Sequence, residues 1–585
     1  MATFALRARV AAASAASAAL GYGVWSQSFA DSHAQRSGWV AAFESQLSPS
    51  VFEPARCDEV KLAPASSSLD VESTSFELKK LQLEFDTPVE LLEKIAADMT
   101  VEMERGLEKD GCMFKMLPSY VCDLPTGKED GEFLALDLGG SNFRVLRFKL
   151  KDGEVSLAAS KKAKIPASTM SKESSGEALF QFIADTVAAL PAGDNGGKPL
   201  PLGFTFSFPC TQYALNAGSL VHWTKGFHTP GVEGEDVVGL LQQAFEKSSI
   251  NVNVAALVND TVGTLVAHVI EAPDTVLGVI LGTGCNACYV EDIANVTKWD
   301  DAPAGKDKVI INMEWGAFDS NKIPGMWNSI DAAIDADEHP GQQRFEKQIS
   351  GRYLGEIARI ACQRLREENA LFSNREGGAK DLVDRVFTSP HAFLTPMMSL
   401  IQGGGAEVDE NNPWKQAAAK AGQGEYTVEL CKSLARAKGV NEEEVERFAN
   451  FWRLWSSTSE SDKAVLRDVC DMVSTRAARL SAAAIGAVIR KIHKEDSCTV
   501  AIDGSVFEHY PFFKENMQIA LLEMFGDKKN IKLELSPDGS GKGAALIAAI
   551  ATPQVAAIAT PREKFKGWRV GKVGAVPEFV DETEE

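Results

Sequence analysis

Two glycine-rich turns in this 585-residue chain could hold the phosphates of a nucleotide. The first, Gly139–Ser141, follows Asp137 and a predicted buried strand at Phe133–Leu136, and the second, Gly282–Gly284, follows the apolar run Leu277–Leu281. Because glycine has no side chain, such turns let backbone N–H groups approach an anion closely. Neither turn is a Rossmann loop, because a strand and not a helix is expected after each of them. Neither is a Walker loop, because the chain has no Walker motif. Together the turns predict a clamp on nucleotide phosphates, with Asp137 beside a hydrated Mg²⁺.

A carboxylate stands where a second buried strand is expected to give way to a helix. Asp260 follows Asn259 and the apolar run Ala255–Val258. Ligands of open α/β sheets gather at the carboxyl ends of strands, and a helix dipole keeps a carboxylate at its N-terminus ionised. Asp260 could therefore accept the proton of an attacking hydroxyl group. On spacing alone, simple capping of the helix explains the same residue.

Polar side chains lie among aromatic ones at three places. These are Phe206–Pro209, Trp223–Phe227 and Asn312–Gly316, and Glu346 follows shortly before a predicted helix. A polyhydroxyl ligand needs side chains that donate and accept hydrogen bonds, and aromatic rings give such a site its dry walls. The three clusters together favour a sugar site, although each alone is also typical of ordinary packing.

The elements that must position these residues alternate between strand and helix. A capping box at Thr87–Glu90 predicts a helix with Pro88 in its first turn. Two similar hairpins surround the glycine turns, and they suggest two α/β lobes of common design. The further strands and the last helix are predicted at Asn142–Leu150, Leu202–Phe208, Cys285–Val290, Thr499–Ile502 and Gly541–Ile550.

Composition excludes several classes of protein. The 60 Lys and Arg residues against 81 Asp and Glu residues give a net charge of −21, which argues against general binding of nucleic acid or anionic lipid. The ten cysteines are scattered, so we expect them to be reduced. Cys285 and Cys288 form the one close pair, but a strand is predicted there and no second ligand pair follows, which leaves redox and zinc chemistry without support.

The first residues differ from the rest of the chain. Met1–Ala30 has no acidic residue, carries Arg7 and Arg9, and is rich in Ala and Ser. This composition is typical of an organelle transit peptide. We expect a plastid or mitochondrial association, with a cytoplasmic protein carrying a plain N-terminal tail as the alternative. The apolar run Val10–Val24 is too short and too dilute for a confident membrane span.

The motifs, taken in order, resemble those of the hexokinase family. The run Leu136–Arg144 resembles the first phosphate motif, and Leu202–Pro209 with Trp223–Phe227 resembles the sugar signature. Ser141 stands where members of the family usually have Thr. The sequence of these motifs is similar to that of plant and algal members, and the length of the chain fits one catalytic unit. Further matches are Val258–Thr264, Leu281–Tyr289, Asn312–Gly316, Glu346–Lys347, Ile349–Gly351, Tyr353–Glu356, Val473–Ala477, Ile502–Ser505 and Asp538–Gly541.

The resemblance implies the two-lobed actin-like ATPase fold, an α/β fold with its active site in a cleft between the lobes. It implies transfer of the γ-phosphoryl group of MgATP to the 6-hydroxyl of a hexose, glucose above all, with fructose and mannose as alternatives, and with Asp260 as the base and Lys225 as a nearby positive charge. The residues implied for the hexose are Ser207, Thr224, Lys225, Asn259, Asp260, Asn286, Glu314 and Glu346. Those implied for ATP are Asp137, Gly139, Gly140, Ser141, Asn142, Arg144, Thr283, Gly504 and Ser505, with Mg²⁺ carried by ATP near Asp137 and not bound directly.

The resemblance also implies a division of the chain into lobes. The large lobe is expected at 41–117 and 261–540, the small lobe at 118–260 and 541–562, with a targeting segment or tail at 1–40 and a tail at 563–585. A monomer is expected. Two other classes of protein remain open: a hexose sensor with little turnover, and an actin-like filament or chaperone protein, which would share only the phosphate hairpins.

Overall fold

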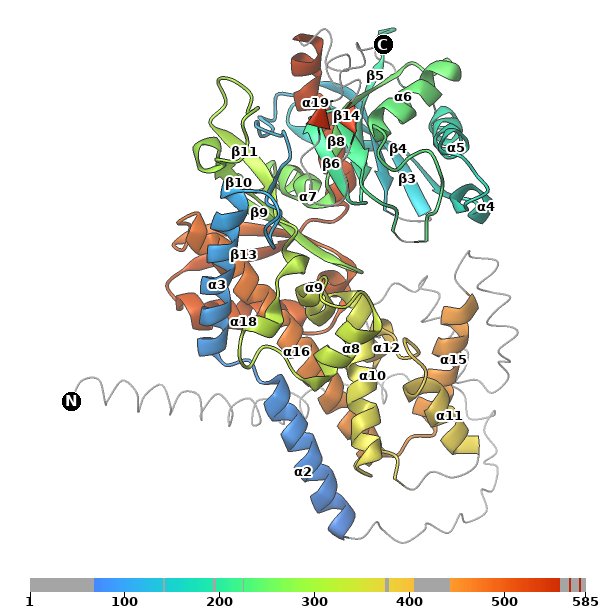
Figure 1. The fold of residues 1–585 in the computed structure, drawn as a ribbon, viewed down its shortest axis with the longest axis vertical. Helices are drawn as coiled ribbons and strands as arrows, with labels where there is room; N and C mark the ends of the chain where they lie inside the picture. Colours follow the sequence, from blue (N-terminus) through green and yellow to red (C-terminus); the bar gives the residue numbers. More distant parts are fainter. Residues whose placement is uncertain are drawn as a thin grey trace, which may run out of the picture. The chain divides into compact units, whose positions relative to one another are not determined.

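Two mixed β-sheets form the framework (Figure 1). The computed structural model describes residues 68–139, 142–191, 193, 196–224, 226–373, 378–403, 442–557, 568–569 and 578–579. The larger sheet has six strands, in the order β1 (Leu117–Pro118), β11 (Lys308–Asn312), β10 (Cys285–Asp292), β9 (Thr275–Leu281), β12 (Ser497–Asp503) and β13 (Asn530–Leu535). The β9–β10 hairpin is antiparallel, whereas β12 runs parallel to both β9 and β13.

The second sheet has five strands and the same kind of hairpin. Its order is β4 (Glu154–Lys164), β3 (Asn142–Lys151), β2 (Gly131–Leu138), β5 (Leu200–Phe206) and β8 (Val252–Val258). The strands β2 and β3 are antiparallel, and β2, β5 and β8 are parallel. Both predicted hairpins are therefore confirmed, and so is the strand that ends before Asn259. The strand predicted at Leu202–Phe208 ends two residues earlier.

Two helices, α7 (Asp260–Val269) and α19 (Gly539–Ala557), pack against each other and against strands of the sheets. Their backbones approach so closely that a methyl group on Gly543 would lie 1.9 Å from the carbonyl oxygen of Gly263. A methyl group on Gly203 of β5 would meet the carbonyl oxygen of Ala544 at 2.0 Å, and one on Gly278 of β9 would meet that of Thr261 at 2.4 Å. Glycines thus fix α7 and α19 against strands of both sheets.

The main hydrophobic core surrounds α16 (Glu460–Lys491), which packs on α3 (Val89–Glu108) and α18 (Phe513–Phe525). By length and composition α16 could cross a membrane, but 89% of its apolar window is buried inside the protein, as in the core helix of a soluble protein. The predicted helix after Thr87 is confirmed as α3, whose apolar face is buried. Its capping box is wrong, because Pro88 is the N-cap residue and no side chain caps the helix.

The other helices cover these sheets and the core. Those of five or more residues are α2 (Ser68–Phe85), α5 (Gly176–Ala188), α6 (Val237–Lys247), α8 (Ser329–Asp337), α9 (Arg344–Ile349), α10 (Gly351–Glu367), α11 (Gly378–Phe387), α12 (Thr395–Ile401), α15 (Glu442–Ser456) and α17 (Ser505–His509). The helix predicted at Gly541–Ile550 is α19, and the strand predicted at Thr499–Ile502 is β12.

Some predictions fall where the structure gives no description. The predicted targeting segment 1–40 lies outside the described residues. In the predicted tail 563–585 the described part is a pair of two-residue strands, β14 (Trp568–Arg569) and β15 (Glu578–Phe579). Since residues Ser67–Glu585 group as a single compact unit, the boundaries of the two lobes stay a prediction.

Candidate active site

Three side chains of the larger sheet form one hydrogen-bonded group. The Asn286 amide of β10 donates to Asn312 Oδ1 at 2.8 Å and to Glu314 Oε1 at 3.0 Å, and the Asn312 amide donates to Glu314 Oε1 at 2.9 Å. The backbone N–H of Glu314 donates back to Asn286 Oδ1 at 3.0 Å. Glu314 has a left-handed backbone, with φ of 59°, just after β11. The group therefore holds the Glu314 carboxylate in one orientation.

Glu346 lies close to this group. The N–H of Cys285 donates to Glu346 Oε2 at 2.9 Å, at the start of β10. Two glycines leave room for it: a methyl group on Gly284 would lie 2.9 Å from Glu346 Oε2, and one on Gly316 would lie 3.2 Å from its Cβ. The second glycine turn and the Glu314 segment thus meet at Glu346.

Asn259 and Asp260 share the start of α7. The N–H of Thr261 donates to Asn259 Oδ1 at 3.0 Å and to Asp260 Oδ1 at 2.9 Å, and the Thr261 hydroxyl donates to Asn259 Oδ1 at 2.6 Å. Asn259 is the N-cap residue and Asp260 is the first residue of the helix. Burial raises the pKa of the Cys288 thiol on β10 to about 12, and the negative charge of Asp260 adds to that rise. The start of α7 lies against the larger sheet, because a methyl group on Gly278 of β9 would lie 2.4 Å from the carbonyl oxygen of Thr261.

Ser207 and Thr224 border a cluster of aromatic rings. The Trp223 ring stacks on Phe227 with centroids 4.9 Å apart and meets the edge of Phe208 at 5.0 Å. The Trp223 indole N–H donates to the carbonyl oxygen of Thr229 at 2.7 Å, which fixes the ring. Thr224 follows directly, and the Ser207 N–H donates to the carbonyl oxygen of Leu138 at 3.2 Å. Lys225 lies outside the described residues.

The two glycine turns have well-defined neighbours. A methyl group on Gly504, which has φ of 122°, would lie 2.4 Å from the carbonyl oxygen of Leu281, so Gly504 and Ser505 adjoin the second turn. The first N–H groups of α10 donate to that turn, Gly351 to Gly282 O at 2.8 Å and Arg352 to Thr283 O at 3.1 Å. Thr283 itself is exposed.

The first turn begins at Gly139, whose added methyl group would lie 4.0 Å from Ser207 Oγ. It therefore starts beside a predicted sugar residue. Gly140 and Ser141 lie outside the described residues, and of Asn142 the structure describes only the backbone.

Charged side chains gather beside the first turn. Arg144 pairs with Asp137 and with Asp538, each at 2.8 Å. Burial raises the pKa of Asp538, against the effect of Arg144, and the negative charge of Asp137 contributes. Burial also raises the pKa of Asp503 at the end of β12, and the charge of Asp538 adds to the rise. Two carboxylates and one guanidinium thus meet where the nucleotide phosphates are expected, and Asp503 is close enough to feel the charge of Asp538.

The motifs of the sequence include Asn312, Asp503 and Asp538, but the sequence alone assigns no role to these three residues. Asn312 ends β11, Asp503 ends β12 and Asp538 follows β13. Polar residues at the ends of strands were the available signal, since ligands of α/β sheets gather there.

Cys285 and Cys288 are buried within the larger sheet. Both thiols are free and lie on β10, and burial raises both pKa values. No group of three or more His, Cys, Asp or Glu residues suited to holding a metal occurs in the described part of the chain.

Comparison with known proteins identifies the family. Two family models, both described as Hexokinase, match residues 77–270 and 276–550. The chain is 38% identical to Hexokinase-1 of Spinacia oleracea over 491 residues, which is 81% of this chain and 90% of the relative, and 38% identical to Hexokinase-2 of Arabidopsis thaliana over 81% and 89%.

A solved structure gives the same result. The Schistosoma mansoni hexokinase in complex with glucose superposes with a TM-score of 0.64 at 35% identity, covering 82% of this chain and 99% of that one. The expected fold, the two-lobed actin-like ATPase fold, and the likeness to plant members are thereby confirmed. The motifs, the paired hairpins and these relatives agree that the chain belongs to the hexokinase family.

Proposed function

We propose that this chain transfers the γ-phosphoryl group of ATP to the 6-hydroxyl of glucose, giving hexose 6-phosphate and ADP as the first step of glycolysis. Family membership gives the coarser activity, ATP-dependent phosphorylation of a hexose. The observation that carries the finer proposal is the placement of Asp260 at the first residue of α7. There it precedes Thr261, whose carbonyl oxygen lies against Gly278 of β9, in the same sheet as Asn286.

In this mechanism the polar groups hold the sugar and Asp260 takes its proton. The hydroxyl groups of the sugar bind two sets of side chains. Those on the side of the six-stranded sheet are Asn286, Glu314 and Glu346, and those on the side of the five-stranded sheet are Ser207, Thr224 and Asn259. Asp260 accepts the 6-hydroxyl proton as the new O–P bond forms, and the N-terminus of α7 keeps the carboxylate ionised beforehand. Lys225, placed by the family motif, would add positive charge near the transferred group.

The ATP side would be built from the two turns. Backbone N–H groups at Gly139–Asn142 and Gly282–Gly284 would face the phosphates, together with Gly504 and Ser505. Asp137 would lie beside the magnesium ion that ATP carries, and a carboxylate is a hard oxygen donor that suits a hydrated Mg²⁺. Magnesium, when bound with ATP, would neutralise charge on the transferred phosphoryl group.

A coupled assay on the purified chain tests the proposal. We expect glucose-dependent ADP production with MgATP, since every side chain assigned to chemistry is present. Glucose should also raise the melting temperature, as any ligand of the folded state does. Glucose binding without turnover would support the sensor instead, and the absence of both effects would favour an actin-like protein of another function.

A plastid or mitochondrial location is our proposal for the full chain, and it rests on the acid-free composition of Met1–Ala30. The family match begins at residue 77, after that segment, so we expect the fold not to need it. Deleting residues 1–35 is expected to leave glucose phosphorylation intact and to move a fluorescent fusion from the organelle to the cytosol. If the full-length and shortened fusions are both diffuse, the targeting proposal fails.

A further inference from the structure

We propose that Asp335 and Asp331 of α8 act as positioning residues for the sugar ligand Glu346, by holding the side chains on both sides of it. The inference rests on the proposed sugar-binding role of Glu346. The helix α9, which carries Glu346, has only six residues. A helix that short is not stable alone, so contacts from elsewhere in the fold must fix its direction.

Asp335 binds a basic side chain on each side of Glu346, Arg344 before it and Lys347 after it. Its Oδ1 accepts from Lys347 Nζ at 2.8 Å, and its Oδ2 accepts from Arg344 Nε at 3.1 Å. The N–H of Gly341 donates to both oxygens at 3.1 Å. Burial alone would raise the pKa of Asp335, but these hydrogen bonds outweigh it and hold the pKa below its usual value. The carboxylate is therefore a buried anion surrounded by donors.

Asp331 holds the other end of α9. It lies four residues before Asp335, so the two carboxylates share one face of α8. The Gln348 amide donates to Asp331 Oδ2 at 3.1 Å. Arg476 of α16 makes two bonds to the same carboxylate, at 2.9 and 2.8 Å, and thereby ties it to the core.

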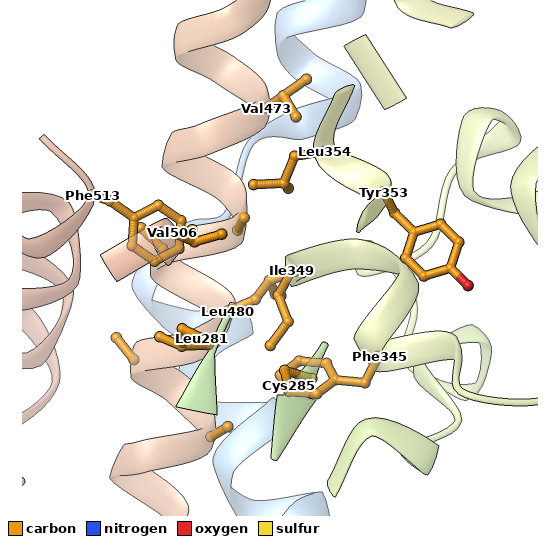
Figure 2. Close-up of a cluster of buried hydrophobic side chains, with 14 of the residues drawn as sticks. Leu281, Cys285, Phe345, Ile349, Tyr353, Leu354, Val473, Leu480, Val506 and Phe513 are labelled. Carbon is orange, nitrogen blue, oxygen red and sulfur yellow. The ribbon is translucent and has the colours of Figure 1, made fainter. Parts of the chain in front are cut away.

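The apolar side chains of α9 are fixed in the same direction. Phe345 is fully buried and meets the edges of Trp315 and Phe318, with centroids 6.2 Å apart in each case. Figure 2 shows Phe345 and Ile349 among the buried side chains of the core that also holds Leu281 and Cys285. Each of the other five residues of α9 thus has a partner in the fold, and Glu346 is directed to the sugar site.

The opposite side of α8 faces a pocket that is partly open to solvent. Ser329, Ile330, Ala333 and Asp337 line a cavity of about 460 Å³ between α8 and α10. The bonds of Asp335 go to α9 and to Gly341, so we expect loss of this carboxylate to loosen Glu346.

The test is calorimetric titration with glucose in the absence of ATP, together with steady-state kinetics. Asp335→Asn keeps the shape of the side chain but turns an amide NH₂ toward donors. We expect the glucose Kd and KM to rise about tenfold, with kcat within about twofold, because Glu346 would bind ground state and transition state alike. If Asp335→Asn fails to fold, Arg344→Gln removes one of its partners from a less buried site and should act in the same direction, and Asp319→Asn controls for the bond that Arg344 also makes to Asp319 at 2.6 Å.

A matched control variant and a double-mutant cycle separate an effect on the position of Glu346 from an effect on the stability of the fold. Glu356→Gln removes an equally buried carboxylate that accepts from Arg359 and from the N–H of His391, with no bond to α9. It should lower the melting temperature and leave the glucose Kd unchanged. In a Glu346→Gln background, Asp335→Asn should change the glucose Kd less than twofold, since its effect passes through Glu346.

Two results would overturn the proposal. If Asp335→Asn shifts the glucose Kd no more than Glu356→Gln does, α8 has only a structural role. If the effects of Asp335→Asn and Glu346→Gln simply add, Asp335 acts by another route. Unchanged glucose binding in Glu346→Gln alone would instead remove Glu346 from the proposed sugar site.

Discussion

Replacing Asp260 with alanine or asparagine is expected to lower kcat by roughly 10²–10⁴-fold, the usual loss when a general base is removed. Asparagine keeps the shape of the side chain and can still accept from the N–H of Thr261, as Asp260 does at 2.9 Å. It cannot accept a proton. Equal losses in the two variants would therefore show that proton transfer matters and capping does not. A coupled assay at saturating glucose and ATP measures kcat.

Glucose binding should largely survive in both Asp260 variants, which calorimetric titration checks. Asp236 provides a matched control, since it caps α6 by accepting from the N–H of Val238 at 3.1 Å. Asp236→Ala should lower the melting temperature and leave kcat unchanged. Near-normal turnover in Asp260→Asn would take this residue out of the mechanism.

A methyl group at Gly543 should be among the most damaging small changes to the fold. In Gly543→Ala the new carbon would lie 1.9 Å from the carbonyl oxygen of Gly263, so α19 and α7 must separate. Backbone cannot move aside as a side chain can. We expect a loss of about 3 kcal/mol or more in the free energy of unfolding, at the upper end for overpacking. Because α7 carries Asp260, kcat should fall as well. Thermal denaturation and the coupled assay measure the two effects.

Gly239 of α6 is the control for this change. A methyl group there would meet a side-chain oxygen, Asp236 Oδ2, at 3.0 Å, which requires only a small shift of that side chain. Gly239→Ala also gains about 1 kcal/mol of helix propensity. It should leave stability nearly unchanged. If Gly543→Ala melts at the same temperature as Gly239→Ala, the close packing of α7 and α19 is not a stabilising contact.

The sequence predicted those parts of the fold that local pattern encodes. The strand before Asn259 is an unbroken apolar run, and both hairpins are apolar runs separated by glycines, so each was identifiable without a partner. The start of α3 was predicted for a reason that proved wrong. The pattern of Thr87 and Glu90 fits a capping box, but Pro88 occupies the N-cap position instead.

The parts that the sequence could not reveal depend on distant contacts. Nothing near Asn286 indicates that its amide joins Asn312 and Glu314, which lie 26 and 28 residues away. The pairing of Arg144 with Asp538 joins β3 to the residue just before α19. Such contacts follow from the order of strands in a sheet, and periodicity does not encode that order. Motif resemblance therefore supplied the site residues, and the structure supplied their partners.

The glycine contacts of α7 and the polar contacts of α9 respond differently to mutation. Asp260 sits on a helix fixed by backbone touching backbone at Gly263, Gly278 and Gly543, where any side chain is too large. Glu346 sits on a helix fixed by side-chain bonds from α8, which can be weakened in steps by exchanging one donor for another. During divergence of such enzymes, hexose affinity can therefore drift gradually while the proton-accepting geometry stays constant. Selection for a different sugar concentration can therefore act on the side-chain bonds between α8 and α9 without changing the position of Asp260 on α7.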